Sequence, residues 1–194
     1  LGGAIYDYGS NGTSSPQIIN VTFIDNSANT GGAIYNKGTA GTSSPQITNA
    51  TFTGNAANFG GAMYNNGGSA GTTNPQITNV TFTGNSATNR GGAIYNDGTA
   101  GTSSPQITNT ILWGNTAPDG PQVYNDNATP TFAHSLIEGS GGSGGWDTSL
   151  GIDDGNNLDA NPFFVDATDP NGADDNPATA DDGLLLQPGS PAVD

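Results

Sequence analysis

The sequence predicts an all-β protein built as a parallel β-helix, or β-solenoid, and three observations lead to that fold class. A Gly-Gly-Ala step recurs at Gly2, Gly31, Gly60 and Gly91, and a degenerate Gly-Pro-Gln copy begins at Gly120. The spacings of 29, 29, 31 and 29 residues are typical of a solenoid in which one repeat makes one coil. Gly, Asn and Thr fill positions where a helical repeat would carry Ala, Leu, Glu or Lys. Short apolar stretches separated by Gly and Asn turns indicate three short strands in each coil.

The first strand of each coil is expected on the Gly-Gly-Ala-Ile-Tyr segment. Its Ile position stays apolar in every copy, whereas the Ala before it becomes Gln122 in the last copy. An inward side chain cannot become polar without losing its solvation, so we expect the Ile position to face inward. The alternation of a strand then predicts that Ala and Tyr face outward. The predicted inward residues are Ile5, Ile34, Met63, Ile94 and Val123.

The other strands of each coil are expected on either side of an Asn bend. Inward residues before the bend are Ile18, Ile47, Ile77 and Ile107, and those after it are Phe23, Phe52, Phe82 and Leu112. Asn tolerates left-handed backbone angles and its amide can bind the Asn of the next coil, so a ladder of stacked amides is expected at the bend. This structural ladder comprises Asn20, Asn49, Asn79 and Asn109; Asn26, Asn55, Asn85 and Asn115 are expected to form a second one. His134 aligns with the bend and is expected to end the first ladder.

The charge of the chain excludes some classes of partner. Its 17 acidic residues against two basic ones give a net charge of −15. Such a charge repels phosphate backbones, so a nucleic acid partner is excluded. The low apolar content predicts no membrane insertion in this segment. The lack of cysteine excludes a disulfide framework and a thiolate metal site.

The acidic residues also divide the chain into two regions. Eleven of the seventeen follow residue 145, so the first 138 residues are nearly uncharged. We therefore expect β-helix coils over residues 1–138 and a Gly- and Asp-rich segment over residues 139–194. This segment is expected to form an irregular acidic cap on the last coil, with Trp146 folding back to cover it.

Two sets of motifs resemble known families. The pairing of GGAIY with "FIDN" and "FTGN" resembles the repeats of surface-exposed β-helical adhesins such as the polymorphic outer-membrane proteins. The segments "ILWGNTAPDGPQVYND", "SLIEG", "NPFFVD" and "TADDGLLLQPGSPAVD" resemble the end of bacterial β-helix proteins that carry a choice-of-anchor Q domain. The resemblance covers essentially the whole chain. It implies a right-handed parallel β-helix in a secreted or cell-surface bacterial protein that is held by an anchor or sorting tail outside this sequence.

The repeated tyrosines are the candidate carbohydrate-binding residues. One ring in each coil would give an outward column at a spacing of about 4.8 Å, on which sugars could stack. The structural alternative, which we favour, is that the rings stack on one another and shield the sheet. The residues are Tyr35, Tyr64, Tyr95 and Tyr124, with Tyr6 at the start of the column.

The acidic run near the end of the chain is a candidate calcium site. Ca²⁺ takes six to eight oxygen ligands from carboxylates and carbonyls on a turning backbone. Repulsion among so many carboxylates also favours a counter-charge, although a solvated acidic loop without an ion is an equal alternative. The expected ligands of this structural Ca²⁺ are Asp166, Asp169, Asn171, Asp174, Asp175, Asp181 and Asp182.

These features favour a non-enzymatic extracellular structural protein: a cell-surface adhesin, a matrix protein or a filament subunit. The carboxylates of the coils are scattered over non-equivalent positions, so no catalytic residue is assigned. A polysaccharide-binding or polysaccharide-degrading β-helix is the alternative, and partial Thr rows leave ice binding as a minor one. Loops with Ser and Thr beside Pro suit O-glycosylation. The expected partners are a glycan and further copies of the chain, joined head to tail through coil ends.

Overall fold

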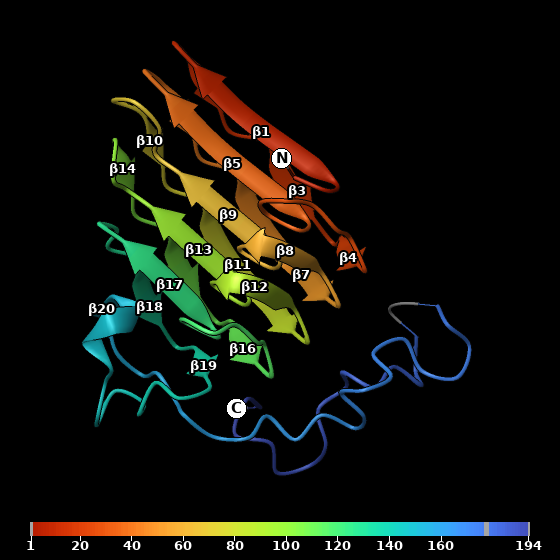
Figure 1. The fold of residues 1–194 in the computed structure, drawn as a ribbon. Coiled ribbons are helices and arrows are strands. Elements are labelled where there is room, and N and C mark those ends of the chain that lie inside the picture. Colours follow the sequence, from red (N-terminus) through yellow and green to blue (C-terminus); the bar gives the residue numbers. More distant parts are fainter. Residues whose placement is uncertain (1, 177–178, 194) are drawn as a thin grey trace.

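The computed structural model describes residues 2–176 and 179–193, and within them the chain winds into a parallel β-solenoid (Figure 1). Its five-stranded sheet stacks one strand from each coil, in the order β1-β5-β9-β13-β17. These strands are β1 (Ile5–Ser10), β5 (Ile34–Thr39), β9 (Met63–Asn66), β13 (Ile94–Asp97) and β17 (Val123–Asp126). The predicted fold class is therefore confirmed.

Three further sheets complete the wall of the solenoid. A four-stranded sheet contains β2 (Thr13–Ser14), β6 (Thr42–Ser43), β10 (Thr72–Thr73) and β14 (Thr102–Ser103). A nine-stranded sheet contains β3 (Gln17–Ile19), β4 (Thr22–Ile24), β7 (Gln46–Thr53), β11 (Gln76–Thr83), β15 (Gln106–Thr108), β16 (Ile111–Trp113), β18 (Thr131–Ala133), β19 (Leu136–Ile137) and β20 (Ile152–Asp153). A fourth short sheet pairs β8 (Ala56–Phe59) with β12 (Ser86–Arg90). No helix in the described residues is long and apolar enough to cross a membrane.

Equivalent residues of successive coils lie directly above one another. Ile34 pairs with Met63 and Met63 with Ile94, for example, so that this column is apolar in each of these coils. The longer spacing before Gly91 is taken up partly by an irregularity between Ala87 and Arg90 of β12, where the register with β8 shifts. A bulge of this kind absorbs an extra residue without moving the neighbouring columns.

The Gly-Gly step is required by the backbone. Gly31, Gly60 and Gly91 have φ between 59° and 67°, a region that side chains rarely adopt. A Cβ on the second glycine of the step would also collide with the coil below, since at Gly32 it would lie 2.0 Å from the Gly61 carbonyl oxygen. The step therefore turns the chain and lets successive coils approach closely.

The predicted inward columns form the core. Ile34, Met63 and Ile94 are fully buried, and the rings of Phe23, Phe52 and Phe82 stack with centroids 4.6 Å apart. Identical side chains in register thus fill the interior layer by layer, and the other predicted inward residues lie in or against the same cluster.

The outward placement predicted for Ala is wrong. Ala33, Ala62 and Ala93 are fully buried in the core because they precede the strand, so strand alternation does not apply to them. Gln122, which replaces Ala in the last copy, is also buried, and its polar atoms are satisfied by Asn115 and Glu138. An inward position can become polar when partners are supplied.

The exposed ladder at the bend follows the prediction in part. Asn20, Asn49, Asn79 and Asn109 all have φ between 50° and 57°. The Asn49 side-chain nitrogen donates to Asn20 Oδ1 at 3.3 Å, and that of Asn79 donates to Asn49 Oδ1 at 3.2 Å. His134 does not end this series, since Asn156 also has φ 58° and its Nδ2 lies 3.0 Å from His134 Nε2.

The second predicted ladder is buried and more strongly bonded. Asn26 Nδ2 donates to Asn55 Oδ1, Asn55 Nδ2 to Asn85 Oδ1 and Asn85 Nδ2 to Asn115 Oδ1, over 2.8–2.9 Å. The same Asn55 Nδ2 also donates to the Phe23 and Thr53 carbonyls. The Asn55 side chain therefore connects the coil before it, the bend of its own coil and the coil after it.

A third ladder, which the sequence analysis did not identify, runs inside the solenoid along the sheet of β1. It is formed by the Asn that follows each Tyr, with donor–acceptor distances of 2.8–2.9 Å along the series Asn36, Asn65, Asn96 and Asn125. We call it the inner amide ladder. Asn125 Nδ2 ends it by donating to the Ser149 and Leu150 carbonyls.

The coil stacking continues past residue 138, where a boundary was expected. β20 pairs with β18, and Leu158 forms a bridge with Leu136. Trp146 does pack on the last coil, with its ring 5.6 Å from that of Phe132, and Leu150 of a short 3₁₀ turn (Thr148–Leu150) is buried in the core. Beyond Leu158 the chain forms an arm with little regular structure (Figure 1).

We predict that Asn55→Ala destabilises the protein by about 3 kcal/mol, because it leaves buried acceptors of two coils without a donor. Urea unfolding followed by circular dichroism measures the change. Asn58→Ala is the matched control, since Asn58 also pairs across coils, with Asn29 at 2.7 Å, but lies exposed. Its expected cost is about 0.5 kcal/mol or less. Equal costs for both variants would contradict a special role for buried amides.

Candidate functional site

The outer face of the β1 sheet carries the predicted tyrosine column. Successive rings have centroids 4.8–5.2 Å apart from Tyr6 to Tyr124. Tyr35, Tyr64 and Tyr95 nevertheless expose only 7%, 8% and 6% of their surface, and they form a cluster of their own outside the core. The prediction of an open aromatic strip is wrong for these three, because each ring is sandwiched between its neighbours. Such stacking is the structural role that we favoured.

Side chains from the preceding turn also cover the column. The Phe59 ring lies 5.8 Å from that of Tyr95, and the Arg90 guanidinium lies 4.7 Å from the centre of the Tyr124 ring. Arg90 also forms an ion pair of 3.7 Å with Asp119. A cation over a ring face is attracted by the ring quadrupole, so Arg90 holds the lower end of the column in place.

Aspartates beside the column hold the tyrosine hydroxyls. Tyr64 Oη donates to Asp97 Oδ2 at 2.8 Å, and Tyr95 Oη donates to Asp126 Oδ2 at 3.4 Å. Asp97 also accepts from Asn66 Nδ2 and, on its other oxygen, from the backbone and hydroxyl of Thr99. These hydrogen bonds tie both carboxylates to the tyrosine column of the preceding coil.

Burial changes the acidity of the column. Desolvation raises the pKa of Tyr35 and of Tyr95 to about 12. The pKa of Tyr64 is raised further, first by desolvation and then by the hydrogen bond to Asp97. A phenolate at any of these positions would be both buried and close to a carboxylate.

Two tyrosines that are open to solvent lie on the first coil. Tyr6 and Tyr8 expose 40% and 42% of their surface, and their rings stack with centroids 5.6 Å apart. Lys37 Nζ lies 5.7 Å from the centre of the Tyr8 ring. This pair, rather than the predicted strip, has the exposed ring surface that a sugar needs.

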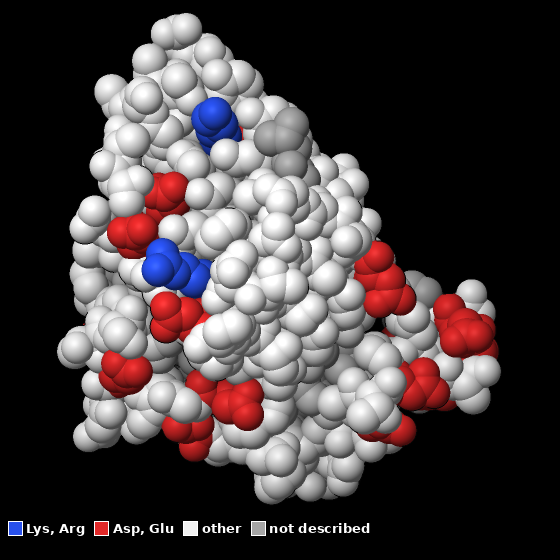
Figure 2. Space-filling model, viewed as in Figure 1, with Lys and Arg blue, Asp and Glu red and all other residues white. Residues whose placement is uncertain are grey.

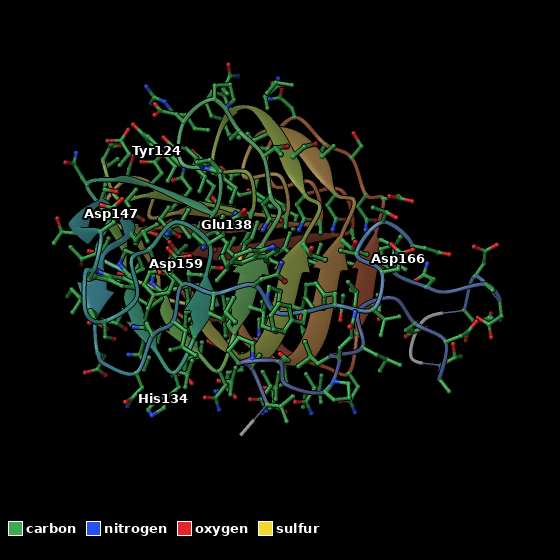
Figure 3. All side chains as sticks on the ribbon, turned by 90° about the horizontal axis from the view of Figure 1, so that it is seen from below. Tyr124, His134, Glu138, Asp147, Asp159 and Asp166 are labelled. Carbon is green, nitrogen blue, oxygen red and sulfur yellow. The ribbon has the colours of Figure 1, made fainter. Side chains whose placement is uncertain are left out.

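A groove of about 760 Å³ runs along the exposed Asn ladder. Its lining includes the amides of Asn79, Asn109 and Asn156, the His134 imidazole, and apolar side chains such as Leu136, Leu158 and Pro191. Asn109 lies in this groove, and no side-chain partner is found for its amide in the described part of the chain. Figure 3 shows His134 pointing away from the body of the solenoid at this face.

A smaller pocket of about 400 Å³ at the end of the solenoid contains Glu138 and Asp147. Glu138 Oε2 accepts from Gly114 N at 2.8 Å and from Gln122 Nε2 at 2.7 Å, and Gln122 in turn accepts from Asn115. Asp147 caps the 3₁₀ turn. Figure 3 shows Glu138, Asp147 and the nearby Asp159 at this end. Glu138 thus terminates the second Asn ladder, which is a structural role.

The expected calcium ligands lie on the C-terminal arm, where Figure 2 shows acidic side chains gathered. Several of their carboxylates bind donors of the arm itself. Asp166 accepts from the Thr168 hydroxyl, Asp181 accepts from the Thr179 hydroxyl, and Asp182 accepts from the Thr179 backbone N–H. Hydrogen bonds from Thr168 and Thr179 lower the pKa of Asp166 and of Asp181, respectively. Within residues 2–176 and 179–193, no three acidic or His side chains converge on a metal position. The calcium site stays a prediction.

The Thr rows considered for ice binding are only partly at the surface. Thr22, Thr51 and Thr81 are half-buried and stacked in register. Thr53 and Thr83, which follow Thr51 and Thr81 by two residues on the same strands, are buried. The pairs Thr81–Ile111 and Thr83–Trp113 end both rows after a few coils.

Comparison with known proteins identifies the repeat. Residues 20–37 and 79–97 match the Chlamydia polymorphic membrane protein (Chlamydia_PMP) repeat. The coils carry a PMP-like repeat. Each match begins at a rung of the exposed ladder, passes through the FxxN segment and ends on the strand that carries the Tyr and the inner amide.

The matches cover well under half of the chain, so the similarity is one of repeats. No curated protein and no solved structure matches the chain. The resemblance to the choice-of-anchor Q type is not confirmed by these comparisons and stays a prediction.

We predict that stability is lost between about pH 10 and pH 12 as the tyrosine column ionises. The tyrosine pKa is 10 in the unfolded chain and about 12 at Tyr35 and Tyr95 in the folded chain. The stability linked to this difference is fully present below pH 10 and is lost as the pH rises through about 12. Urea unfolding at a series of alkaline pH values, with tyrosinate absorbance recorded in parallel, measures this loss. Tyr95→Phe should flatten the pH dependence, whereas an unchanged slope in that variant would contradict the assignment to the column.

Proposed function

We propose that this chain is a non-enzymatic extracellular structural protein, a rigid cell-surface solenoid of the adhesin, matrix or filament type. The PMP-like repeat is the observation that carries this proposal, since the name of the matched family places its members in a membrane. The match falls on the segments that build the coil wall, so it concerns the architecture of the solenoid itself.

The geometry of the acidic groups supports a role without catalysis. Asp97 and Asp126 hold tyrosine hydroxyls, and Glu138 ends an Asn ladder. A glycosidase needs two carboxyl groups across a substrate bond, about 5 to 9.5 Å apart, with protons free to move. The carboxylates described here are instead used to fix neighbouring coils.

The alternative is a polysaccharide-binding solenoid, and two surfaces favour it. The exposed Tyr6 and Tyr8 rings offer an apolar platform of the kind on which sugars stack. The groove at Asn109 and His134 offers amide and imidazole groups beside apolar walls, which suits a neutral chain of hydroxyl groups.

We predict that antibodies raised against the solenoid label intact cells of the source organism and that surface proteolysis removes the signal. Labelling that appears only after lysis would contradict a surface role.

The purified chain, incubated with a panel of acidic and neutral polysaccharides, should release no reducing ends. Retention on one of them without release would favour the binding alternative, and release would reject the non-enzymatic proposal.

End-to-end association is part of this proposal. β1 pairs only with β5, and β17 only with β13, within the described residues. An unpaired strand edge such as that of β1 is a template for another strand. The opposite end is covered by the 3₁₀ turn at Ser149 and Leu150, so the first coil of one copy would stack on the residues that cover β17 in the next. Ca²⁺ held by the acidic arm would serve as a junction between copies.

We predict fibres in electron micrographs of the native protein and their loss when EGTA is added. Discrete short rods would contradict the filament. Fibres that survive EGTA would keep the filament and reject a calcium junction.

A further inference from the structure

The inner amide ladder is a chain of donors with one direction. Asn36 Nδ2 donates to Asn65 Oδ1 at 2.8 Å and Asn65 Nδ2 to Asn96 Oδ1 at 2.8 Å. Each amide therefore gives a hydrogen to the coil that follows and presents its oxygen to the coil that precedes. Asn36, Asn65 and Asn96 are all fully buried.

The ladder meets a carboxylate where an amide would be expected. Asp7 is the register partner of Asn36, so it occupies the inner-ladder position of the first coil. Asn36 Oδ1, which by the direction of the ladder points to that coil, is buried and has no hydrogen-bond partner among the residues that the structure describes. A carboxylate has no hydrogen to donate, so two acceptors face each other in the interior.

The surroundings of Asp7 supply hydroxyl groups but no positive charge. Ser14 Oγ donates to Asp7 Oδ1, and Ser43 Oγ donates to Asp7 Oδ2 at 2.5 Å. Asp7 is 6% exposed, and the one salt bridge found among the described residues joins Arg90 to Asp119. Lys37, the nearest basic residue in register, lies on the opposite face of the sheet over the Tyr8 ring. A buried carboxylate without a counter-charge is costly.

We propose that a small monovalent cation of the size of Na⁺ binds between Asp7 and Asn36 inside the first two coils. Its ligands are an Asp7 carboxylate oxygen, Asn36 Oδ1 and the hydroxyl oxygens of Ser14 and Ser43. This set consists of oxygen atoms only, which hard cations prefer.

The spacing of the ladder suits such an ion. Facing side-chain atoms of the ladder lie 2.8–2.9 Å apart, so an ion that lies to the side of two facing oxygens can be about 2.3 to 2.6 Å from both. This is the range of distances between Ca²⁺ and oxygen, and Na⁺ has almost the same radius. The site has one carboxylate among neutral ligands, and this single negative charge balances a monovalent ion. We therefore assign Na⁺ rather than Ca²⁺. A water molecule could bridge the two oxygens but would leave the charge in place.

The test compares thermal unfolding of the full chain at neutral pH in NaCl and in choline chloride of equal ionic strength. We expect the melting temperature of the native chain to be about 5 °C higher in saturating NaCl. Asp7→Asn should be insensitive to sodium and as stable in choline chloride as the native chain is in NaCl, because the new amide donates to Asn36 Oδ1. Asp25→Asn, which removes the same charge at an exposed position, should keep the full sodium response.

Four outcomes overturn the proposal. The first is an equal melting temperature of the native chain in both salts, and the second is a sodium response that survives Asp7→Asn. The third is stabilisation by CaCl₂ but not by NaCl. The fourth is a stability in choline chloride that rises as the pH is lowered in the native chain but not in Asp7→Asn. The last would show that a proton joins the two oxygens. Broadening of the sodium NMR signal by the native chain, and its absence with Asp7→Asn, would support the site directly.

Discussion

Polar side chains buried between coils set the register of this solenoid. An amide in the interior must meet another amide at the same height, or it loses its hydrogen bonds without water to replace them. The second Asn ladder and the inner amide ladder run through successive coils and leave few choices of alignment. A shift of one residue would leave Asn55 facing Gly84 or Ser86, neither of which has an amide side chain to pair with it. The apolar columns fill the space, but it is the amides that distinguish one register from the next.

The outer face follows from the same constraint. Once the coils are aligned, the tyrosines stand above one another at about the strand spacing, and their rings contact one another in tilted or stacked pairs. Their hydroxyls then lie beside the next outward column, where Asp97 and Asp126 accept from them. The column is therefore a continuation of the wall rather than a surface left open for a ligand. The regular covering by neighbouring coils is lost at Tyr6 and Tyr8, which are exposed, and at Asn109, which lies in the groove.

Much of this arrangement could be predicted because a repeat reports each structural position several times. The core columns and both predicted ladders were read from positions that keep one residue type, such as Phe52 and Asn55. The inner amide ladder left a signal too, since Asn follows Tyr in four coils and strand alternation turns it inward. What could not be predicted lies where local geometry overrides alternation. Ala33 sits in the turn after Gly31 and Gly32, and the cover over Tyr95 comes from Phe59 of the preceding turn.

The departures from the repeat show how each ladder ends. Gln122 stands where other coils carry Ala, and it passes the hydrogen bonds of Asn115 to Glu138 at the rim. Asn125 finds the carbonyls of a 3₁₀ turn instead of another amide. Asp7 breaks the inner amide ladder at the opposite end, where no donor replaces the missing amide. A ladder that runs in one direction has an unpaired donor at one end and an unpaired acceptor at the other, so its two ends need different chemistry. The donor end is closed by carbonyls of the chain itself, and the acceptor end requires a positive charge or a hydrogen from elsewhere.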